Sequence, residues 1–196
     1  VFKKVSDKLG GNIRFFVSGG APLARSVFDF FESMGFPVVE GYGLTETSPC
    51  IAGCRLDQVR KAGSVGQVLA SQEVSLTEDR ELIVKGPNIM QGYFENDKAT
   101  KDVIKNGWFH TGDIATIDED GYIFIVDRLK EIIVLSNGKN VAPQPIETTI
   151  KNNPYIAQIM LVGDNHSYIT ALIVPDFEAL TRDIDISKTH ADPKDW

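Results

Sequence analysis

The sequence has few of the features that mark several specialised protein classes. Two cysteines among 196 residues are too few for a secreted disulfide scaffold or, with no histidine near them, for a structural zinc site. No apolar run approaches the length of a membrane span, and the first residues lack the apolar core of a signal peptide. We therefore expect Cys50 and Cys54 to be reduced thiols of a cytoplasmic protein, with peripheral attachment to a membrane left open.

Positive charge is also scarce. Twenty lysines and arginines stand against 27 aspartates and glutamates, which gives a formal net charge of -7 and a pI near 5.0. A surface that binds nucleic acid or an anionic membrane normally carries a basic patch. We therefore predict small-molecule partners and no nucleic acid, while the oligomeric state stays unknown.

The first region, residues 1–60, has the pattern of an α/β layer. The short apolar run Ile13–Val17 predicts a buried strand, which ends at a Ser-Gly-Gly turn. Apolar residues then follow at helical spacing from Val27 to Met34, and Gly35 marks the end of that helix. Pro37–Glu40 reads as a second strand, and this order of elements favours a parallel pair.

The second region, residues 61–128, is rich in predicted β-strands. Glu81–Lys85 has the composition of a strand, and two apolar runs flank the turn 118-DEDG-121, which predicts a hairpin. The turn lacks the ligand spacing of a calcium loop, so we expect a solvated turn. Short strands with glycine-rich turns suggest a small distorted barrel or sandwich.

The third region, residues 129–196, predicts a compact α+β unit. A strand over Glu131–Leu135 turns at an Asn-Gly pair, and a helix begins near Pro143. Two further strands pair across 164-DNHS-167, and another helix begins at Phe177. The last ten residues, SKTHADPKDW, form a polar tail without apolar periodicity, and we expect the chain to be a fragment.

The stretch 41-GYGLTE-46 carries the strongest chemical signal. It follows a predicted strand, where ligands bind in open α/β sheets, and its glycines allow a ligand to approach the backbone. Tyr42 can offer a flat face to a purine, Thr45 a hydroxyl to a phosphate, and Glu46 a carboxylate to Mg²⁺. The alternative is a surface turn with a packed tyrosine.

Three other stretches are candidates with ordinary alternatives. The turn 18-SGG-20 can present N–H groups to an anion, although it matches neither the phosphate-loop nor the dinucleotide pattern. In 107-GWFHTGD-113, Asp113 can accept hydrogen bonds from the two hydroxyls of a ribose, or act as a helix or turn cap. His110 is more often a packed or surface residue than a base. The run 126-VDRLKE-131 is either a surface charge cluster or a boundary where ligands and hinges gather.

Together these stretches resemble the adenylate-forming acyl-CoA synthetase superfamily, the AMP-binding enzymes. The resemblance runs in order through SGGAPL, GYGLTE, WFHTGD, DGYIFIVDRLKEIIV and NGKNVAPQPIE, from Ile13 to about Asp176. The stretch SNGKNVAPQPIE is most similar to long-chain fatty-acid CoA ligases. The resemblance implies an α/β plus α+β fold. Residues 1–60 would end the large α/β domain, 61–128 form a β-rich subdomain, and 129–196 form a truncated small domain with a hinge near 128–131.

The resemblance also implies roles for individual residues. Tyr42 would pack on adenine, Thr45 would contact the α-phosphate, and Glu46 would bind Mg²⁺. Asp113, helped by Arg128, would hold the ribose hydroxyls, and Lys130 would be the hinge residue with a catalytic role. The remaining predicted cofactor contacts are Gly20, Ala21, Glu40, Gly41, Gly43 and Ile125 around the nucleotide, and Gly138 near the pantetheine of coenzyme A.

The implied activity is an ATP-dependent ligase that adenylates a carboxylic acid, most similar to long-chain fatty acids, and transfers the acyl group to coenzyme A. Two alternatives stay open: an enzyme for another acid such as an aryl acid, and an inactive nucleotide-binding module. The family's phosphate loop with its lysine is not present in this sequence. Neither Lys188 nor Lys194 has the surroundings of the family's second catalytic lysine, and Val134 stands where some relatives carry a lysine. These departures also indicate a fragment, which we expect to be inactive by itself.

Overall fold

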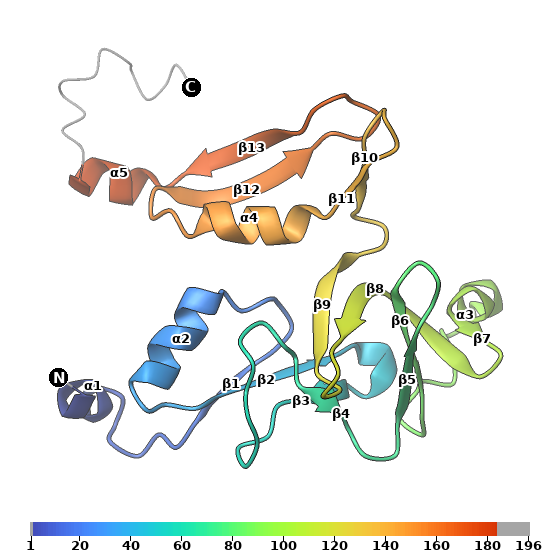
Figure 1. Cartoon of the computed structure of the whole chain (residues 1–196), viewed down its shortest axis with the longest axis horizontal. Coiled ribbons are helices and arrows are strands. Elements are labelled where there is room, and N and C mark those ends of the chain that lie inside the picture. The colour runs from blue at the N-terminus through green and yellow to red at the C-terminus, as the bar shows by residue number, and fades with distance from the viewer. Residues whose placement is uncertain (1, 184–196) are drawn as a thin grey trace. The chain divides into compact units, whose positions relative to one another are not determined.

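The computed structural model describes residues 2–183, and the polar tail with Lys188 and Lys194 lies outside them. The chain divides into two compact units, Val1–Lys130 and Glu131–Trp196, and Figure 1 labels their helices and strands. Among residues 2–183, no helix combines the length and the apolar character that crossing a membrane requires.

The first unit begins with the predicted α/β layer. Helix α1 (Phe2–Lys8) precedes β1 (Phe16–Ser18), α2 (Arg25–Ser33) and β2 (Val38–Gly43). Strands β1 and β2 pair in parallel, as the order of elements predicts. Helix α2 packs through Phe31, whose ring centroid lies 4.8 Å from that of Phe16, and it ends before Gly35, whose φ is +78°.

The prediction of a buried strand over Ile13–Val17 is wrong in its bounds and its burial. Strand β1 starts only at Phe16, and Val17 is 72% exposed. The reason is geometric: β1 is an edge strand, and neighbouring residues of a strand face opposite sides of the sheet. Phe16 faces α2, so Val17 faces away from that helix.

Strand β2 is longer than predicted, because Gly41, Tyr42 and Gly43 continue it instead of forming a loop. The next strand, β3 (Cys50–Gly53), returns antiparallel to β2 and pairs Tyr42 with Ala52, with an irregularity between Tyr42 and Gly43. This pairing gives the backbone of the two glycines β-sheet partners that the sequence pattern did not reveal. Strand β4 (Gln67–Val68) completes the first sheet, in the order β1-β2-β3-β4.

The β-rich part is a five-stranded antiparallel sheet. Its strands follow the order β5-β6-β8-β7, and β9 also pairs with β8. The sheet is open, and the isolated bridge between Gln67 and Tyr122 joins it to the first sheet, so the predicted barrel or sandwich is an open, linked pair of sheets. The elements are β5 (Glu73–Leu76), β6 (Glu81–Lys85), α3 (Asp97–Val103), β7 (Ile104–Lys105), β8 (Trp108–Ile117) and β9 (Ile123–Arg128).

Two apolar clusters form the core of the first unit. One contains Ala52, Leu82, Ala115 and Ile123, and the other contains Ile51, Val84 and Phe109. The ring of Tyr42 packs against both clusters. The first residues of the GYGLTE motif are therefore held in position by packing against the core.

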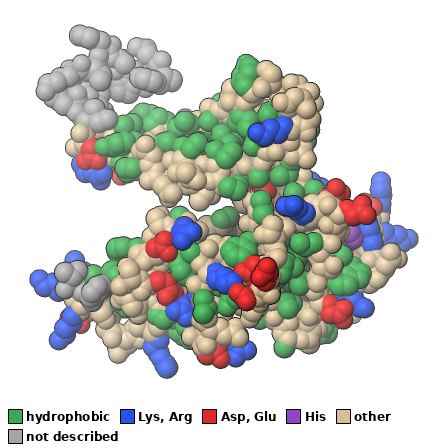
Figure 2. Space-filling view, viewed as in Figure 1, with side chains coloured by type: hydrophobic (Ala, Val, Ile, Leu, Met, Phe, Trp, Pro, Cys, Tyr) green, Lys and Arg blue, Asp and Glu red, His purple; other side chains and the backbone are tan. Residues whose placement is uncertain are grey.

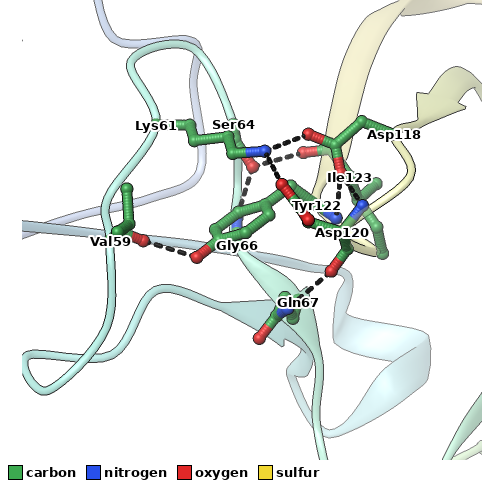
Figure 3. A network of polar contacts seen from close by, with 9 residues as sticks. All are labelled: Val59, Lys61, Ser64, Gly66, Gln67, Asp118, Asp120, Tyr122 and Ile123. Carbon is green, nitrogen blue, oxygen red and sulfur yellow. Dashed lines mark hydrogen bonds and ion pairs between the residues drawn. The ribbon is translucent and has the colours of Figure 1, made fainter.

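A polar network connects the loop after β3 with the β8–β9 hairpin (Figure 3). Lys61 Nζ lies 2.6 Å from Asp118 Oδ2 and 2.7 Å from Asp120 Oδ2, and it sits 4.5 Å from the centre of the Tyr122 ring. The Tyr122 hydroxyl donates to the carbonyl of Val59 at 2.6 Å. The 118–121 segment is a turn with Glu119 and Asp120 exposed, as predicted. In addition, two of its carboxylates hold a lysine that is distant in the sequence.

The second unit has the predicted order of strand, helix and two strands. Strands β12 and β13 pair antiparallel, and α4 packs against β12. Apolar side chains on β12 and β13 remain exposed, among them Met160 (53%) and Leu172 (62%), and Figure 2 shows hydrophobic side chains gathered on this unit. The elements are β10 (Ile133–Val134), β11 (Asn140–Val141), α4 (Pro143–Lys151), β12 (Ile156–Val162), β13 (Thr170–Pro175) and α5 (Phe177–Asp183).

Candidate functional site

The centre of the candidate site is a triad of side chains from three strands. The Tyr42 hydroxyl, on β2, donates a 2.5 Å hydrogen bond to Asp113 Oδ2, on β8. Arg128 Nε, on β9, lies 3.0 Å from Asp113 Oδ1. Asp113 and Arg128 are direct cross-strand partners in the β8–β9 pair. The structure thus brings together three residues that the sequence analysis selected from three separate motifs.

Burial and charge set the protonation of this triad. The pKa of the Asp113 carboxyl is raised above its usual value, chiefly by burial, although the Tyr42 hydroxyl and Arg128 lower it in part. Burial and the nearby Asp113 carboxylate raise the pKa of Tyr42 well above its usual value. Tyr42 is therefore a hydrogen-bond donor at neutral pH. Asp113 lies within β8, so the alternative of a helix or turn cap is wrong.

Each oxygen of the Asp113 carboxylate accepts one bond from this triad, and each has further lone-pair capacity. Arg128 is half-exposed, with 49% of its side chain accessible, while only 8% of the Asp113 side chain is. The Asp113 carboxylate is thus a buried hydrogen-bond acceptor with a fixed orientation, and the Arg128 guanidinium lies on its solvent side. Such a group suits a ligand that presents hydroxyls.

Glu81 aligns the backbone that carries Asp113. Its Oε1 accepts from the N–H of Gly112 at 2.9 Å, and its Oε2 lies 2.7 Å from His110 Nδ1. His110 is thus engaged with a carboxylate and lies in the strand that leads to Asp113. Sequence reasoning missed Glu81, because its only signal was membership of an ordinary strand.

The Thr45–Thr47 turn is a short 3-10 helix, η1, that follows β2 directly. The buried Thr47 hydroxyl accepts from the N–H of Leu44 at 3.0 Å and donates to the carbonyl of Pro49 at 2.7 Å. These bonds close the turn and leave the Thr45 side chain exposed and Glu46 half-buried. Thr45 and Glu46 therefore lie side by side at the end of the strand that carries Tyr42.

Gly43 has a structural role in addition to its predicted one. A Cβ at this position would lie 1.7 Å from the carbonyl oxygen of Pro49. Only glycine lets the chain return this closely, so any other residue would displace the turn that holds Thr45 and Glu46.

The turn after β1 lies against the same strand. A Cβ on Gly19 would be 3.0 Å from the carbonyl oxygen of Gly41, and Gly20 has a φ of +80°. Gly20 and Ala21 are exposed. The backbone of this predicted nucleotide contact is thus beside the GYG segment.

Glu40 is a buried acid on the same strand. The residue is 6% exposed, and its Oε1 has no hydrogen-bond partner in the structure. Burial raises the pKa of Glu40 to about 7, although the N–H of Gly63 lowers it in part.

The other predicted residues occupy different parts of the chain. Ile125, on β9, packs against the first apolar cluster. Lys130 is exposed and is the last residue of the first unit. Gly138 lies in the β10–β11 turn of the second unit with a φ of +79°.

Comparison with known proteins identifies the family. Residues 2–94 match the AMP-binding enzyme family, and residues 130–190 match the AMP-binding enzyme C-terminal domain. This chain belongs to the AMP-binding enzyme family. The resemblance found in the sequence motifs is therefore confirmed.

Several relatives of this AMP-binding chain are long-chain fatty-acid CoA ligases. Long-chain-fatty-acid–CoA ligase FadD15 of Mycobacterium bovis is 42% identical over 179 residues, which cover 91% of this chain and 30% of FadD15. Long chain acyl-CoA synthetase 1 of Arabidopsis thaliana is 37% identical over 196 aligned residues, 92% of this chain and 30% of the synthetase. The chain thus spans about a third of the length of these relatives.

A solved structure confirms the fold class of this AMP-binding chain, α/β plus α+β. O-succinylbenzoate coenzyme A synthetase (MenE) of Bacillus subtilis, in complex with ATP and magnesium ion, has a TM-score of 0.74 and 27% identity. The alignment covers 89% of this chain and 40% of MenE.

Proposed function

We propose that this chain carries the nucleotide-binding part of an ATP-dependent acyl-CoA ligase whose acid substrate is a long-chain fatty acid. The observation that carries the proposal is the triad of Tyr42, Asp113 and Arg128, which joins the GYGLTE and WFHTGD motifs through direct contacts. The names of the relatives, FadD15 and long chain acyl-CoA synthetase 1, support the choice of acid.

The proposed reaction has two steps. The substrate carboxylate attacks the α-phosphorus of ATP and forms an acyl-adenylate, and pyrophosphate leaves. The thiol of coenzyme A then attacks the acyl carbon, forms a thioester and releases AMP. Both steps depend on positioning and charge neutralisation more than on a protein nucleophile, which agrees with a site of hydroxyls, carboxylates and glycines.

The geometry of the triad and the resemblance of the motifs to the family support the proposed nucleotide contacts. Asp113 accepts hydrogen bonds from the ribose hydroxyls, and Arg128, 3.0 Å from its carboxylate, opposes part of the rise in its pKa that burial causes. Tyr42 lies beside the adenine, with its orientation fixed by the bond to Asp113. The exposed Thr45 hydroxyl contacts the α-phosphate. The remaining proposed contacts are Gly20, Ala21, Glu40, Gly41, Gly43 and Ile125.

Glu46 fits the role of the residue that binds Mg²⁺. Within residues 2–183, no group of three His, Cys, Asp or Glu side chains is arranged to hold a metal ion. Mg²⁺ commonly binds through one or two carboxylates together with substrate phosphates and keeps several waters. A single half-buried carboxylate next to the phosphate-binding threonine suits that mode, in which the ion supplies charge neutralisation at the phosphates.

Two further roles concern the second half-reaction. We propose Lys130 as the hinge residue, because it is the last residue of the first compact unit, and a few backbone dihedrals at such a boundary can absorb a rotation. We propose that Gly138 lies near the pantetheine of coenzyme A, supported by the NGKNVAPQPIE motif and the β10–β11 turn.

We also propose a cytoplasmic protein with small-molecule substrates and no nucleic-acid partner. Both cysteines are free thiols, Cys50 exposed and Cys54 buried, and the formal net charge is -7. Peripheral attachment to a membrane is compatible with a long-chain acyl substrate.

A segment exchange tests the proposed activity. This chain replaces the matching segment of M. bovis FadD15, and thioester formation from coenzyme A and ATP is measured with palmitate and with benzoate. We expect the exchange protein to form the thioester with palmitate. The same exchange protein carrying Glu46→Ala is the matched control, and we expect it to be inactive. A folded exchange protein that is inactive with both acids contradicts the ligase proposal, and a preference for benzoate contradicts the choice of a long-chain acid.

A further inference from the structure

The loop of residues 86–94, which follows β6, holds the Thr45–Thr47 turn from outside. Asn88 Nδ2 donates to the carbonyl of Thr47 at 2.7 Å, and the N–H of Met90 donates to the carbonyl of Glu46 at 2.8 Å. These two bonds fix the backbone of the turn. Neither touches the carboxylate of Glu46.

A third bond from this loop does reach that carboxylate. The Tyr93 hydroxyl donates to Glu46 Oε1 at 2.9 Å. Over residues 2–183, no other hydrogen bond or ion pair engages the Glu46 carboxylate, so its Oε2 is the oxygen left for a ligand.

Tyr93 is itself fixed by the start of α3. Its N–H donates to Thr100 Oγ1 at 2.9 Å, and Asn96 caps the helix by accepting from the N–H of Ala99 at 3.1 Å. A Cβ on Gly92 would lie 2.8 Å from Thr100 Oγ1, and Gly92 has a φ of +154°. Glycine before Tyr93 therefore allows the chain to lie close to α3. This close contact fixes the position of the Tyr93 phenol.

We propose that Tyr93 is a positioning residue for the Glu46 carboxylate, holding Oε1 so that Oε2 faces the divalent cation that accompanies ATP. The inference rests on the proposed function, because it assumes that Glu46 binds this cation. Tyr93 touches neither the nucleotide nor the reacting atoms in this role. Its contribution is to restrict the rotation of a carboxylate that is otherwise held only through its backbone.

The test measures how strongly Mg²⁺ improves ATP binding. Calorimetry gives the Kd of this chain for ATP in Mg²⁺ and in EDTA, and the ratio of the two values isolates the contribution of the cation. Tyr93→Phe keeps the ring and removes only the hydroxyl. We expect the ratio to fall roughly three- to tenfold, the range of one hydrogen bond, with the Kd in EDTA unchanged.

Two variants serve as controls. Tyr168→Phe removes a hydroxyl from a 63% exposed tyrosine of the second unit and should leave the ratio unchanged. Asn88→Ala removes a bond to the backbone of the turn; it should lower the melting temperature and leave the ratio near the wild-type value. If the ratio of the two Kd values falls as much in Asn88→Ala as in Tyr93→Phe, the effect comes from a general loss of order in the Thr45–Thr47 turn, and the inference is overturned.

The two proposals fail in different ways. An unchanged ratio in Tyr93→Phe, or a wild-type chain that binds ATP equally with and without Mg²⁺, overturns the role of Tyr93. AMP binding, which needs no cation, still tests the nucleotide site in both cases. A folded wild-type chain that binds neither ATP nor AMP overturns the nucleotide site and the inference together.

Discussion

Glu40 should make the stability of the first unit depend on pH. The residue is 6% exposed, one of its carboxyl oxygens has no hydrogen-bond partner, and burial raises its pKa from the ordinary 4.5 to about 7. Between these two values the folded chain keeps a proton that the unfolded chain has lost. Unfolding then releases a proton, so the free energy of unfolding falls as pH rises through this window.

The size of the effect follows from the shift. A change from 4.5 to about 7 corresponds to an upper limit of about 3 kcal/mol, at about 1.4 kcal/mol per pKa unit. The limit is not reached in full if water and nearby dipoles rearrange around the ionised carboxylate. The stability is fully present below pH 4.5 and is lost by the time the pH has passed 7.

Glu40→Gln removes the ionisation and keeps the shape of the side chain. Urea unfolding at pH 5 and pH 8 measures the free energy of unfolding for both proteins. We expect the wild-type chain to lose more stability between these pH values than the variant, and the variant to be the more stable of the two at pH 8. Glu73→Gln, at an exposed position of β5, is the matched control. Parallel pH profiles for wild type and Glu40→Gln would refute the reasoning, because they would mean that Glu40 ionises equally well in both states.

Three further predictions concern the proposed activity. Asp113→Ala should weaken AMP binding and reduce the preference for AMP over 2′-deoxy-AMP; an unchanged ratio of the two Kd values assigns Asp113 a structural role only. In a catalytically active protein that contains this chain, Thr45→Ala and Glu46→Ala should each slow adenylation about a hundred- to thousandfold, mainly in the rate constant; near-normal ATP–pyrophosphate exchange contradicts these roles. In the same protein, Lys130→Pro should leave adenylation largely intact and impair thioester formation, because proline fixes φ. Equal loss of both half-reactions, with a lower melting midpoint by circular dichroism, points to general damage to the fold.

Local signals in the sequence predicted much of the fold. The Asn137-Gly138 pair and the 118–121 turn marked two hairpins that the structure contains, because turn residues act over a few positions. The burial of β1 was not predictable in this way. Whether Val17 is covered depends on which face of the strand α2 occupies, and a short apolar run does not record that choice.

The residues of the candidate site also differ in how well the sequence predicted them. Tyr42, Glu46 and Asp113 were found because they lie in motifs with a recognisable order. Tyr93 and Glu81 were missed, because their contacts join residues 47 and 31 positions apart, and nothing in their neighbours marks such partners. Residues that hold a motif in place leave a weaker signal than the motif itself.

The hydrogen bonds that connect Ile123 to the segment around Val65 have a consequence for the order of folding. The N–H of Val65 donates to the carbonyl of Ile123, and the N–H of Ile123 donates to the carbonyl of Gly66, both at 2.9 Å. On the ribosome, the segment around Val65 emerges well before Ile123 and has to wait for these partners. Contacts of such long sequence separation slow folding. The early half of the unit, which includes the GYGLTE segment, is therefore expected to complete its packing only after the β8–β9 hairpin has been synthesised.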